Sequence, residues 1–214
     1  MNKLLVVTAC FWEDTSPIIR LEESCKKFDI PLRVFGVGGG FKDYTQMKTE
    51  GLLEFLPTII ADYEYIMYTD GFDSWLLKDE KEIIKRFEKF DSDIVIASNY
   101  DCYPNRDLAK MFPSSDSGSD YVCAGQIMGK AEELLKCIKV IARKFSHIRS
   151  DQGAWALAFV EGLADISIDY DDKIFNTATR HKSGLPDSCS IHFAGGSSNL
   201  ENMNKAYKLW KELP

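Results

Sequence analysis

One short stretch constrains the fold of this chain more than any other: Tyr65-Ile66-Met67-Tyr68-Thr69, followed directly by Asp70-Gly71-Phe72-Asp73. The first five residues are β-prone and flanked by polar residues, which predicts a buried central strand rather than a helix. A strand that ends in a tight glycine turn can direct Asp70 and Asp73 into the crevice beyond its carboxyl end, where α/β sheets bind ligands. Clustered carboxylates suit a divalent cation, and the cation in turn suits a diphosphate. The alternative is that the two aspartates only cap the next turn.

Segments with strand character and segments with helix character alternate along the chain. The expected strands cover residues 1–10, 32–37, 65–69, 93–98, 121–129, 166–170 and 190–193. The expected helices cover residues 16–28, 44–61 with a break at Gly51 or Pro57, 79–90, 130–146, a segment that begins at Ser150, and 199–213. Ser16 and Pro17 are typical of a helix start, as cap and first helical residue. Because no repeat or linker interrupts this order, we expect a single α/β domain over residues 1–214.

Composition and charge exclude several classes of protein. With 45% hydrophobic and 28% charged residues, the 214-residue chain resembles an ordinary soluble globular protein. A formal charge of -7 disfavours a broad nucleic-acid-binding face, which would need clustered lysines and arginines. The apolar run at the start is too short for a signal peptide, and no segment approaches the roughly 20 apolar residues of a membrane span. We therefore expect a soluble protein in the cytoplasm.

The six cysteines point to the same compartment. None of them forms a C-x-x-C pair, and most lie within apolar or strand-like stretches. This pattern favours reduced, buried thiols in a reducing compartment. Disulfides remain the alternative, because six is an even number.

Three consecutive glycines, Gly38-Gly39-Gly40, follow the second expected strand. Glycine lets a backbone approach a phosphate closely, but the G-x-G-x-x-G spacing of a dinucleotide site is missing. A flexible loop is therefore the favoured interpretation.

His192 is the histidine whose position suggests a ligand. It ends a short β-like run and precedes a Gly-Gly turn, which places its side chain at the mouth of a sheet. A single histidine at a strand end is more often structural. Together with Asp70 and Asp73, however, it would form a set of two oxygen donors and one nitrogen donor, which suits Mn²⁺ better than Ca²⁺.

The order and the sequences of these segments resemble one family: the glycosyltransferase domain of procollagen lysyl hydroxylases and the related procollagen galactosyltransferases. The resemblance covers most of the chain and rests on a collinear series rather than on a single motif. The matching segments are Val6–Ala9, Phe35–Gly38 with a following lysine, Met67–Asp73, Ala97-Ser98, Cys102–Pro104, Tyr121–Gly129, Asp151-Gln152, Ile168–Tyr170, Ile174-Phe175, and His192 before Gly195. The resemblance implies a GT-A (Rossmann-like) fold, with a mixed central sheet flanked by helices.

The resemblance also implies roles for individual residues. Asp70, Asp73 and His192 would hold Mn²⁺, with Mg²⁺ as the alternative ion, and the ion would bind the diphosphate of a UDP-sugar. Phe72 would stack on uracil, Lys48 would offset phosphate charge, and the backbone of Gly195 would approach the phosphates. Thr8 and Ala9, at the end of the first strand, would line the nucleotide site. Asp151 and Gln152 would lie beside the donor sugar and the acceptor as the catalytic pair.

Three departures from the family pattern lie on the sugar and acceptor side. The family's Asn-Ser-Gly is Cys123-Ala124-Gly125 here, its acidic run before the glutamine is reduced to Ser150-Asp151, and its Trp-Pro is Tyr103-Pro104. The resemblance therefore extends to metal and nucleotide binding more directly than to the acceptor. With no hydroxylase segment, collagen-type context or secretory signal in the sequence, we expect a microbial or viral enzyme that acts on a hydroxyl other than that of collagen.

These observations predict a metal-dependent glycosyltransferase that moves a hexose from a UDP-sugar to a hydroxyl acceptor. The acceptor would be a glycan, a protein side chain or a hydroxylated nucleobase, and nucleic acid would enter only in that role. One alternative is a nucleotide-sugar-binding or hydrolysing protein that lacks transfer activity. Another is a GT-A-like domain that serves only as a binding scaffold. The sequence predicts no oligomeric state.

Overall fold

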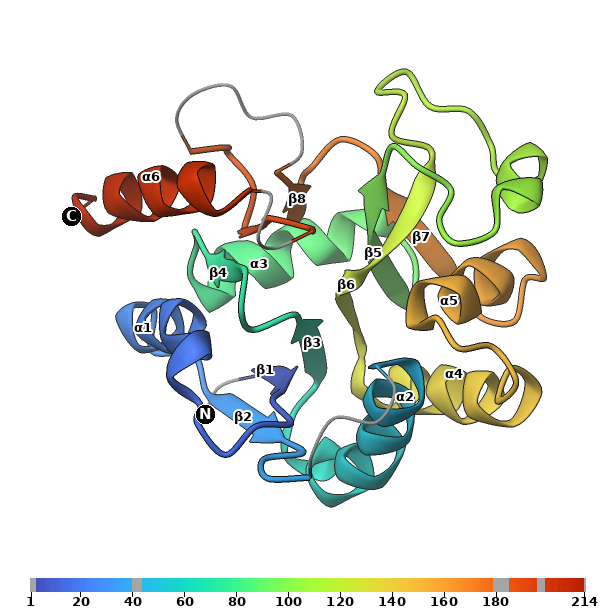
Figure 1. The fold of residues 1–214 in the computed structure, drawn as a ribbon, viewed down its shortest axis with the longest axis horizontal. Helices are drawn as coiled ribbons and strands as arrows, with labels where there is room; N and C mark the ends of the chain where they lie inside the picture. The colour runs from blue at the N-terminus through green and yellow to red at the C-terminus, as the bar shows by residue number, and fades with distance from the viewer. Residues whose placement is uncertain (1–2, 40–43, 179–184, 196–198, 214) are drawn as a thin grey trace.

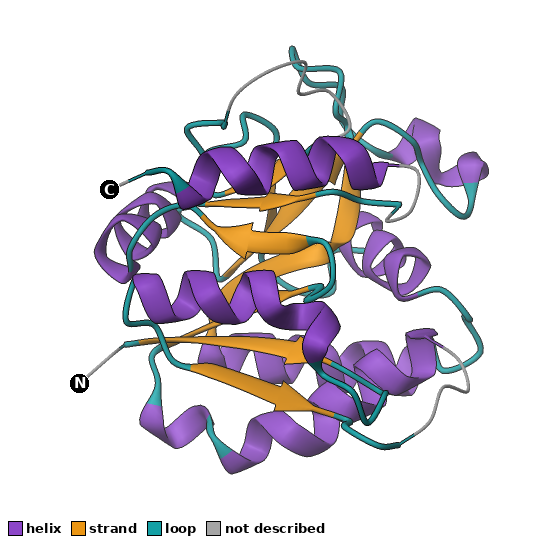
Figure 2. Cartoon of the chain, turned by 60° about the vertical axis from the view of Figure 1, so that its left-hand side comes forward, coloured by secondary structure: helices purple, strands orange, loops and turns teal. Residues whose placement is uncertain are grey.

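The computed structural model describes residues 3–39, 44–178, 185–195 and 199–213, and it shows a layered α/β fold (Figure 1). Helices cover both faces of the larger sheet, as Figure 2 also shows. The larger sheet has six strands in the described part of the chain: β1 (Leu4–Ala9), β2 (Leu32–Phe35), β3 (Tyr65–Thr69), β5 (Ile94–Asn99), β6 (Tyr121–Lys130) and β7 (Ile166–Asp169). The prediction of a mixed sheet flanked by helices is confirmed.

The strand order of the larger sheet is β2-β1-β3-β6-β5-β7. Strands β2, β1 and β3 are parallel, and β6 is antiparallel to both of its neighbours, β3 and β5. The chain moves from β1 to β2 on one side and then returns to β3 on the other. Such a reversal opens a crevice at the carboxyl ends of the strands, and Ala9 and Thr69 end their strands there.

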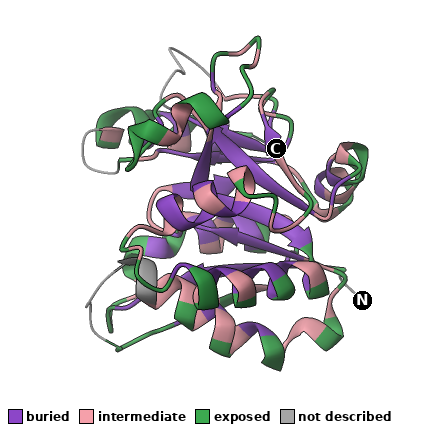
Figure 3. Cartoon of the chain, turned by 90° about the vertical axis from the view of Figure 1, so that its right-hand side faces the viewer, coloured by how far each residue is buried: buried purple, intermediate pink, exposed green. Residues whose placement is uncertain are grey.

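The central strands are predominantly apolar because both of their faces are buried. In β1, Leu5 and Val7 face α2, α4 and α5, whereas Leu4 and Val6 face α1 and α3. In β3, Met67 faces the same side as Leu4 and Val6. Figure 3 shows the result, with buried strands in the middle and helices that are exposed on their outer faces. These continuous cores fix the strand ends from which the site is built.

A second, three-stranded sheet lies beside the first. Its order is β4-β9-β8, from β4 (Ser74–Leu76), β8 (Phe175–Thr177) and β9 (Ser190–His192). Helix α6 (Leu200–Lys211) covers it through Met203, Ala206 and Trp210, which pack with Trp75 and Phe193. This sheet holds His192 next to the end of β3.

The remaining helices agree with most of the expected segments. They are α1 (Ile19–Lys27), α2 (Tyr44–Phe55), α3 (Glu80–Phe87), α4 (Ala131–Lys144) and α5 (Asp151–Val160), with 3-10 turns at Ser16–Ile18, Leu56–Thr58, Ile60–Asp62, Glu88–Phe90 and Arg106–Met111. The helix that was expected over residues 44–61 ends before Pro57 rather than at Gly51, because proline cannot supply a backbone N–H to the helix. Helices α3 and α5 begin at side-chain caps, from Asp79 to the N–H of Glu82 and from Ser150 to the N–H of Gly153.

Two details of the prediction were wrong. Ser16 does not cap α1: it lies within a 3-10 turn, and its backbone N–H and hydroxyl donate to the carboxylate of Asp14. The expected strand over residues 32–37 ends at Phe35, since Gly36 adopts a φ of +81° that breaks the extended backbone.

All six cysteines are buried and unpaired, as expected for reduced thiols. Within the described residues, no helix has both the length and the apolar character needed to span a membrane.

Candidate metal centre and donor site

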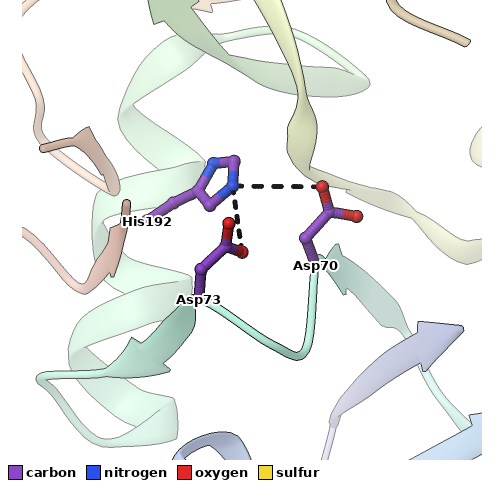
Figure 4. A group of neighbouring side chains, drawn as sticks. All are labelled: Asp70, Asp73 and His192. Carbon is purple, nitrogen blue, oxygen red and sulfur yellow. Dashed lines mark ion pairs between the residues drawn. The ribbon is translucent and has the colours of Figure 1, made fainter. Parts of the chain in front are cut away.

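The structure brings Asp70, Asp73 and His192 together (Figure 4). Asp70 follows the last residue of β3, and its backbone N–H donates to the carbonyl of Gly125 in β6 at 2.8 Å. The turn through Gly71 then leads to Asp73, which directly precedes β4. Ser74 of β4 pairs with His192 of β9, so the smaller sheet places the imidazole over the turn.

The three side chains have the geometry and the donor chemistry of a metal site. One donor atom from each lies within 4.8 Å of the others. His192 Nε2 lies 3.3 Å from Asp73 Oδ1 and 3.9 Å from Asp70 Oδ2. The side chain of His192 is 4% exposed, against 15% for Asp73 and 27% for Asp70, so the trio opens to solvent on the side of Asp70. Two carboxylates and one imidazole fit Mn²⁺ or Mg²⁺, and no soft thiolate donor is among them.

The surroundings of His192 favour the protonated form of its imidazole when no cation is present. Burial alone would lower the pKa of the imidazole, but the negative charge and hydrogen bond of Asp73 raise it well above its ordinary value. A metal must therefore displace a proton from Nε2, and the position of Nε2 between two carboxylates favours that exchange of one cation for another.

Gly125 provides the space that the imidazole occupies. A Cβ atom at this position would lie 2.2 Å from His192 Cε1, 2.7 Å from its Nδ1 and 3.1 Å from Asp70 Oδ2. No side chain fits there, so the glycine is required by the packing of the site. Cys123, two residues earlier on the same face of β6, places its Sγ 3.8 Å from Nδ1 of His192.

Hydrogen bonds from buried hydroxyl and amide groups stabilise the turn that contains Asp70 and Asp73. The Tyr68 hydroxyl donates to Asp70 Oδ1 at 2.8 Å, and burial raises the pKa of this phenol so that it keeps its proton. Ser74 Oγ donates to the carbonyl of Asp70 and lies 2.7 Å from Thr69 Oγ1. The amide of Gln126 donates to Thr69 Oγ1 at 3.2 Å and to Ser190 Oγ at 2.8 Å, which links the two sheets. The side chain of Asp70 and the backbone of the turn are thus held in place before any ligand binds.

Lys48 joins the metal centre to the expected catalytic pair. Its Nζ lies 2.6 Å from Asp70 Oδ1 and 2.9 Å from Asp151 Oδ2, over the ring of Tyr68. Burial would lower the pKa of Lys48, yet Asp70, Tyr68 and Asp151 together raise it well above the ordinary value, so the ammonium remains charged. Because Lys48 and Tyr68 occupy Oδ1 of Asp70, the other oxygen, Oδ2, is the one that faces His192 and Asp73.

Asp151 and Gln152 lie at the start of α5. Asp151 is in the first turn, where the helix dipole favours a carboxylate. Gln152 donates from Nε2 to the carbonyl of Tyr103 at 3.3 Å, which links α5 to the segment before Pro104. The structure therefore places Asp151 beside Lys48 and directs Gln152 toward Tyr103.

Phe72 lies in the turn between the two aspartates and is half-buried. Its ring contacts the indole of Trp12 edge to face, with the centroids 4.9 Å apart. Trp12 follows the end of β1, so two aromatic rings from adjacent strand ends meet beside the metal centre.

The other expected nucleotide-binding residues differ in accessibility. Thr8 and Ala9 are buried at the end of β1, and Thr8 Oγ1 lies 2.7 Å from the point where a Cβ on Gly71 would be. Gly195 is exposed in the turn after β9, with a φ of +91° that favours glycine. In the triple glycine, Gly38 also has a positive φ, of +74°, and Gly40 lies outside the described residues.

Sequence reasoning missed the contributions of Tyr68, Gln126 and Trp12, and it gave Gly125 no role in the packing of the site. An isolated glycine within a strand is a signal of close backbone approach, so its role could have been found. The contacts of Tyr68 and Gln126 depend on which strands are neighbours, which the sequence does not state.

Comparison with known proteins finds one family and its relatives over most of the chain. A profile described as the PLOD GT domain matches residues 1–208. Human procollagen-lysine,2-oxoglutarate 5-dioxygenase 2 is 23% identical over 213 residues, covering 94% of this chain and 28% of the relative. The multifunctional procollagen lysine hydroxylase and glycosyltransferase of Caenorhabditis elegans is 27% identical over 146 residues, covering 64% and 20%. Uncharacterized protein R699 of Acanthamoeba polyphaga mimivirus is 25% identical over 179 residues, covering 80% and 38%. The chain thus spans 28% of the length of the human relative.

Among solved structures, the chain is similar to a glycosyltransferase involved in the glycosylation of the major capsid of PBCV-1. The two share a TM-score of 0.65 at 9% sequence identity, over 98% of this chain and 99% of the other. This similarity concerns the fold, and it confirms the expected GT-A-like architecture.

Proposed function

Because this chain belongs to the family of PLOD GT domains, which are glycosyltransferases, we propose that it transfers a hexose from a UDP-sugar to a hydroxyl acceptor with the help of a divalent cation. One observation supports this proposal above the others: the trio Asp70, Asp73 and His192 is connected through Lys48 to Asp151 at the carboxyl ends of the central strands. The trio and Lys48 suit a diphosphate, and the carboxylate of Asp151 suits the sugar.

The residues of this chain would divide the chemistry as follows. Asp70, Asp73 and His192 would hold Mn²⁺ or Mg²⁺, and the bound ion would stabilise the charge that builds on the departing diphosphate. Lys48 is a fixed cation next to the same place, and its ammonium stabilises that charge without reorganisation. Phe72, joined by Trp12, offers an apolar ring for the base.

On the sugar side, Asp151 would stabilise the positive character that the sugar carbon gains as the bond to the diphosphate breaks. The ion pair with Lys48 holds this carboxylate in place. Gln152 lies on the next position of the same helix turn and is directed toward Tyr103, which is where we propose that the acceptor enters.

The acceptor is proposed as a hydroxyl of a glycan, of a protein side chain or of a hydroxylated nucleobase. The names of the relatives include lysine hydroxylation and glycosyl transfer, and the similar solved structure concerns capsid glycosylation. All three classes share an oxygen nucleophile that must lose a proton during transfer.

A thermal-shift screen tests the donor site first. UDP, GDP, ADP and their sugars are each added with Mn²⁺, with Mg²⁺ or with EDTA, because a ligand that binds only the folded state raises the Tm. We expect a metal-dependent shift with UDP and with one UDP-sugar, lost in Asp73→Asn and retained in Asp62→Asn, an exposed carboxylate in the 3-10 turn that precedes β3, at the opposite end of this strand from Asp70. Metal-independent binding that survives Asp73→Asn would support the scaffold alternative instead.

The chemical step is then tested with the sugar that the screen selects. Release of UDP that requires an added hydroxyl compound, with the sugar recovered on that compound, would support transfer. Release of UDP and free sugar at the same rate with and without acceptor would favour the hydrolase alternative. The absence of any metal-dependent nucleotide binding would overturn the proposed function.

A further inference from the structure

The two nitrogens of His192 face different neighbours. Nε2 faces the carboxylates of Asp70 and Asp73, as described above. Nδ1 lies 3.8 Å from the Sγ atom of Cys123, within the longer range of hydrogen bonds to sulfur. Cys123 is 2% exposed in β6, where it pairs with Ala97 of β5. The imidazole is thus held between a thiol on one nitrogen and the metal centre on the other.

A metal-binding imidazole needs a partner on its second nitrogen. The hydrogen bond at that nitrogen fixes which one carries the proton and how the ring is oriented, and so decides whether the lone pair faces the ion. In proteins this partner is usually a carboxylate, a backbone carbonyl or a water. Within the residues that the structure describes, the atom within reach of Nδ1 is the Cys123 sulfur.

Packing alone does not set the orientation of the ring. Gly125 leaves room for the imidazole and lies against Cε1 and Nδ1, which restricts how far the ring can approach β6. A flat contact of this kind does not distinguish a ring carbon from a ring nitrogen. The thiol does, because sulfur accepts from an N–H and gains little from a C–H.

We propose that Cys123 is a positioning residue for the metal centre, whose Sγ accepts a hydrogen bond from Nδ1–H of His192 and so keeps Nε2 directed at Asp70 and Asp73. This inference rests on the proposed function, since it assumes that the trio binds a cation. Sulfur is a weak acceptor, so the effect on metal affinity falls at the lower end of what such partners contribute, about tenfold.

The test measures the Kd of Mn²⁺ by titration calorimetry on metal-free protein. Cys123→Ala and Cys123→Val both remove the acceptor but leave different volumes in the core, so an effect that both share comes from the lost hydrogen bond. Cys137→Ala is the matched control, because this thiol is equally buried, at 2% exposure, but lies in α4. We expect the Kd to rise about tenfold in both Cys123 variants and to stay unchanged in the control.

A double substitution separates positioning from a general disturbance of the site. If Cys123 acts through His192, then Cys123→Ala should change the Mn²⁺ affinity of the His192→Ala protein by less than twofold. An equal loss in both backgrounds, or wild-type affinity in the Cys123 variants, would overturn the proposal. Failure of the unmodified protein to bind Mn²⁺ would instead refute the metal site on which the proposed function depends.

Discussion

Replacing Gly125 by alanine should disable the metal centre while leaving the fold intact. The new Cβ would lie 2.2 Å from His192 Cε1, whereas ordinary contacts of a Cβ begin at 3.4 Å. The ring must therefore retreat by about 1.2 Å, and it cannot do so while keeping Nε2 in place, since metal–ligand distances tolerate about 0.2 Å. Asp70 Oδ2, at 3.1 Å from the same point, is displaced as well.

Loss of a well-placed imidazole, with one carboxylate shifted, should raise the Kd of Mn²⁺ by about 100-fold, or about 2.7 kcal/mol. Overpacking at this buried position should lower the free energy of unfolding by about 1–3 kcal/mol. Titration calorimetry with Mn²⁺ and urea unfolding measure the two effects separately.

Gly129→Ala is the control for this experiment. It lies in the same strand, and its Cβ would meet the carbonyl of Asp93 and two aliphatic carbons at 3.1–3.2 Å, away from the trio. We expect this variant to lose some stability and to bind Mn²⁺ normally. A folded Gly125→Ala protein with wild-type Mn²⁺ affinity would refute the reasoning.

Three further outcomes are expected. Because the pKa of His192 in the metal-free protein is raised, the stability that its protonated ring provides is complete below about pH 6.5 and disappears as the pH rises through the folded-state pKa. Melting curves in EDTA should show this decline above pH 6.5, and His192→Gln should remove it. Lys48→Met leaves Asp70 and Asp151 without their shared cation, so urea unfolding should show a loss of about 2 kcal/mol, and an unchanged midpoint would count against the ion pairs. In the native protein the carboxylate of Asp169 accepts hydrogen bonds from three backbone N–H groups, and Asp169→Asn would place an amide donor against them. This substitution should lower the free energy of unfolding by about 2 kcal/mol and accelerate amide exchange at the start of β8.

The sequence was sufficient to predict the elements that have a strong period or a clear terminus. The apolar run of β3 and the cap at Ser150 both occur where expected, because burial on two faces and side-chain capping are local signals. Asp70, Asp73 and His192 were also selected correctly as neighbours, since two short strands end beside them.

What the sequence did not reveal depends on contacts between distant segments. Strands β4 and β8 have three residues each, too few for any periodicity to appear. Lys48 and Asp151 were both singled out, but their ion pair joins residues 103 positions apart, and it follows only from the packing of α2 against α5. Gly125 signals a close approach by being a glycine within a strand, but that His192 is the group it makes room for follows only from the packing of β9 beside β6.

The two sheets share the metal centre, and this has a consequence for how the molecule opens. Asp70 directly follows a strand of the larger sheet, whereas Asp73 precedes β4 and His192 ends β9, both in the smaller sheet. A cation held by all three would act as a cross-link, so the smaller sheet could not separate from the larger one without releasing it. At 100 times the Kd, the cation would raise the free energy of that local opening by about 2.7 kcal/mol. Hydrogen exchange in β9 and α6 would then slow on metal binding, although α6 contributes no ligand. Cation binding at the end of β3 could thus be measured in the last helix of the described chain.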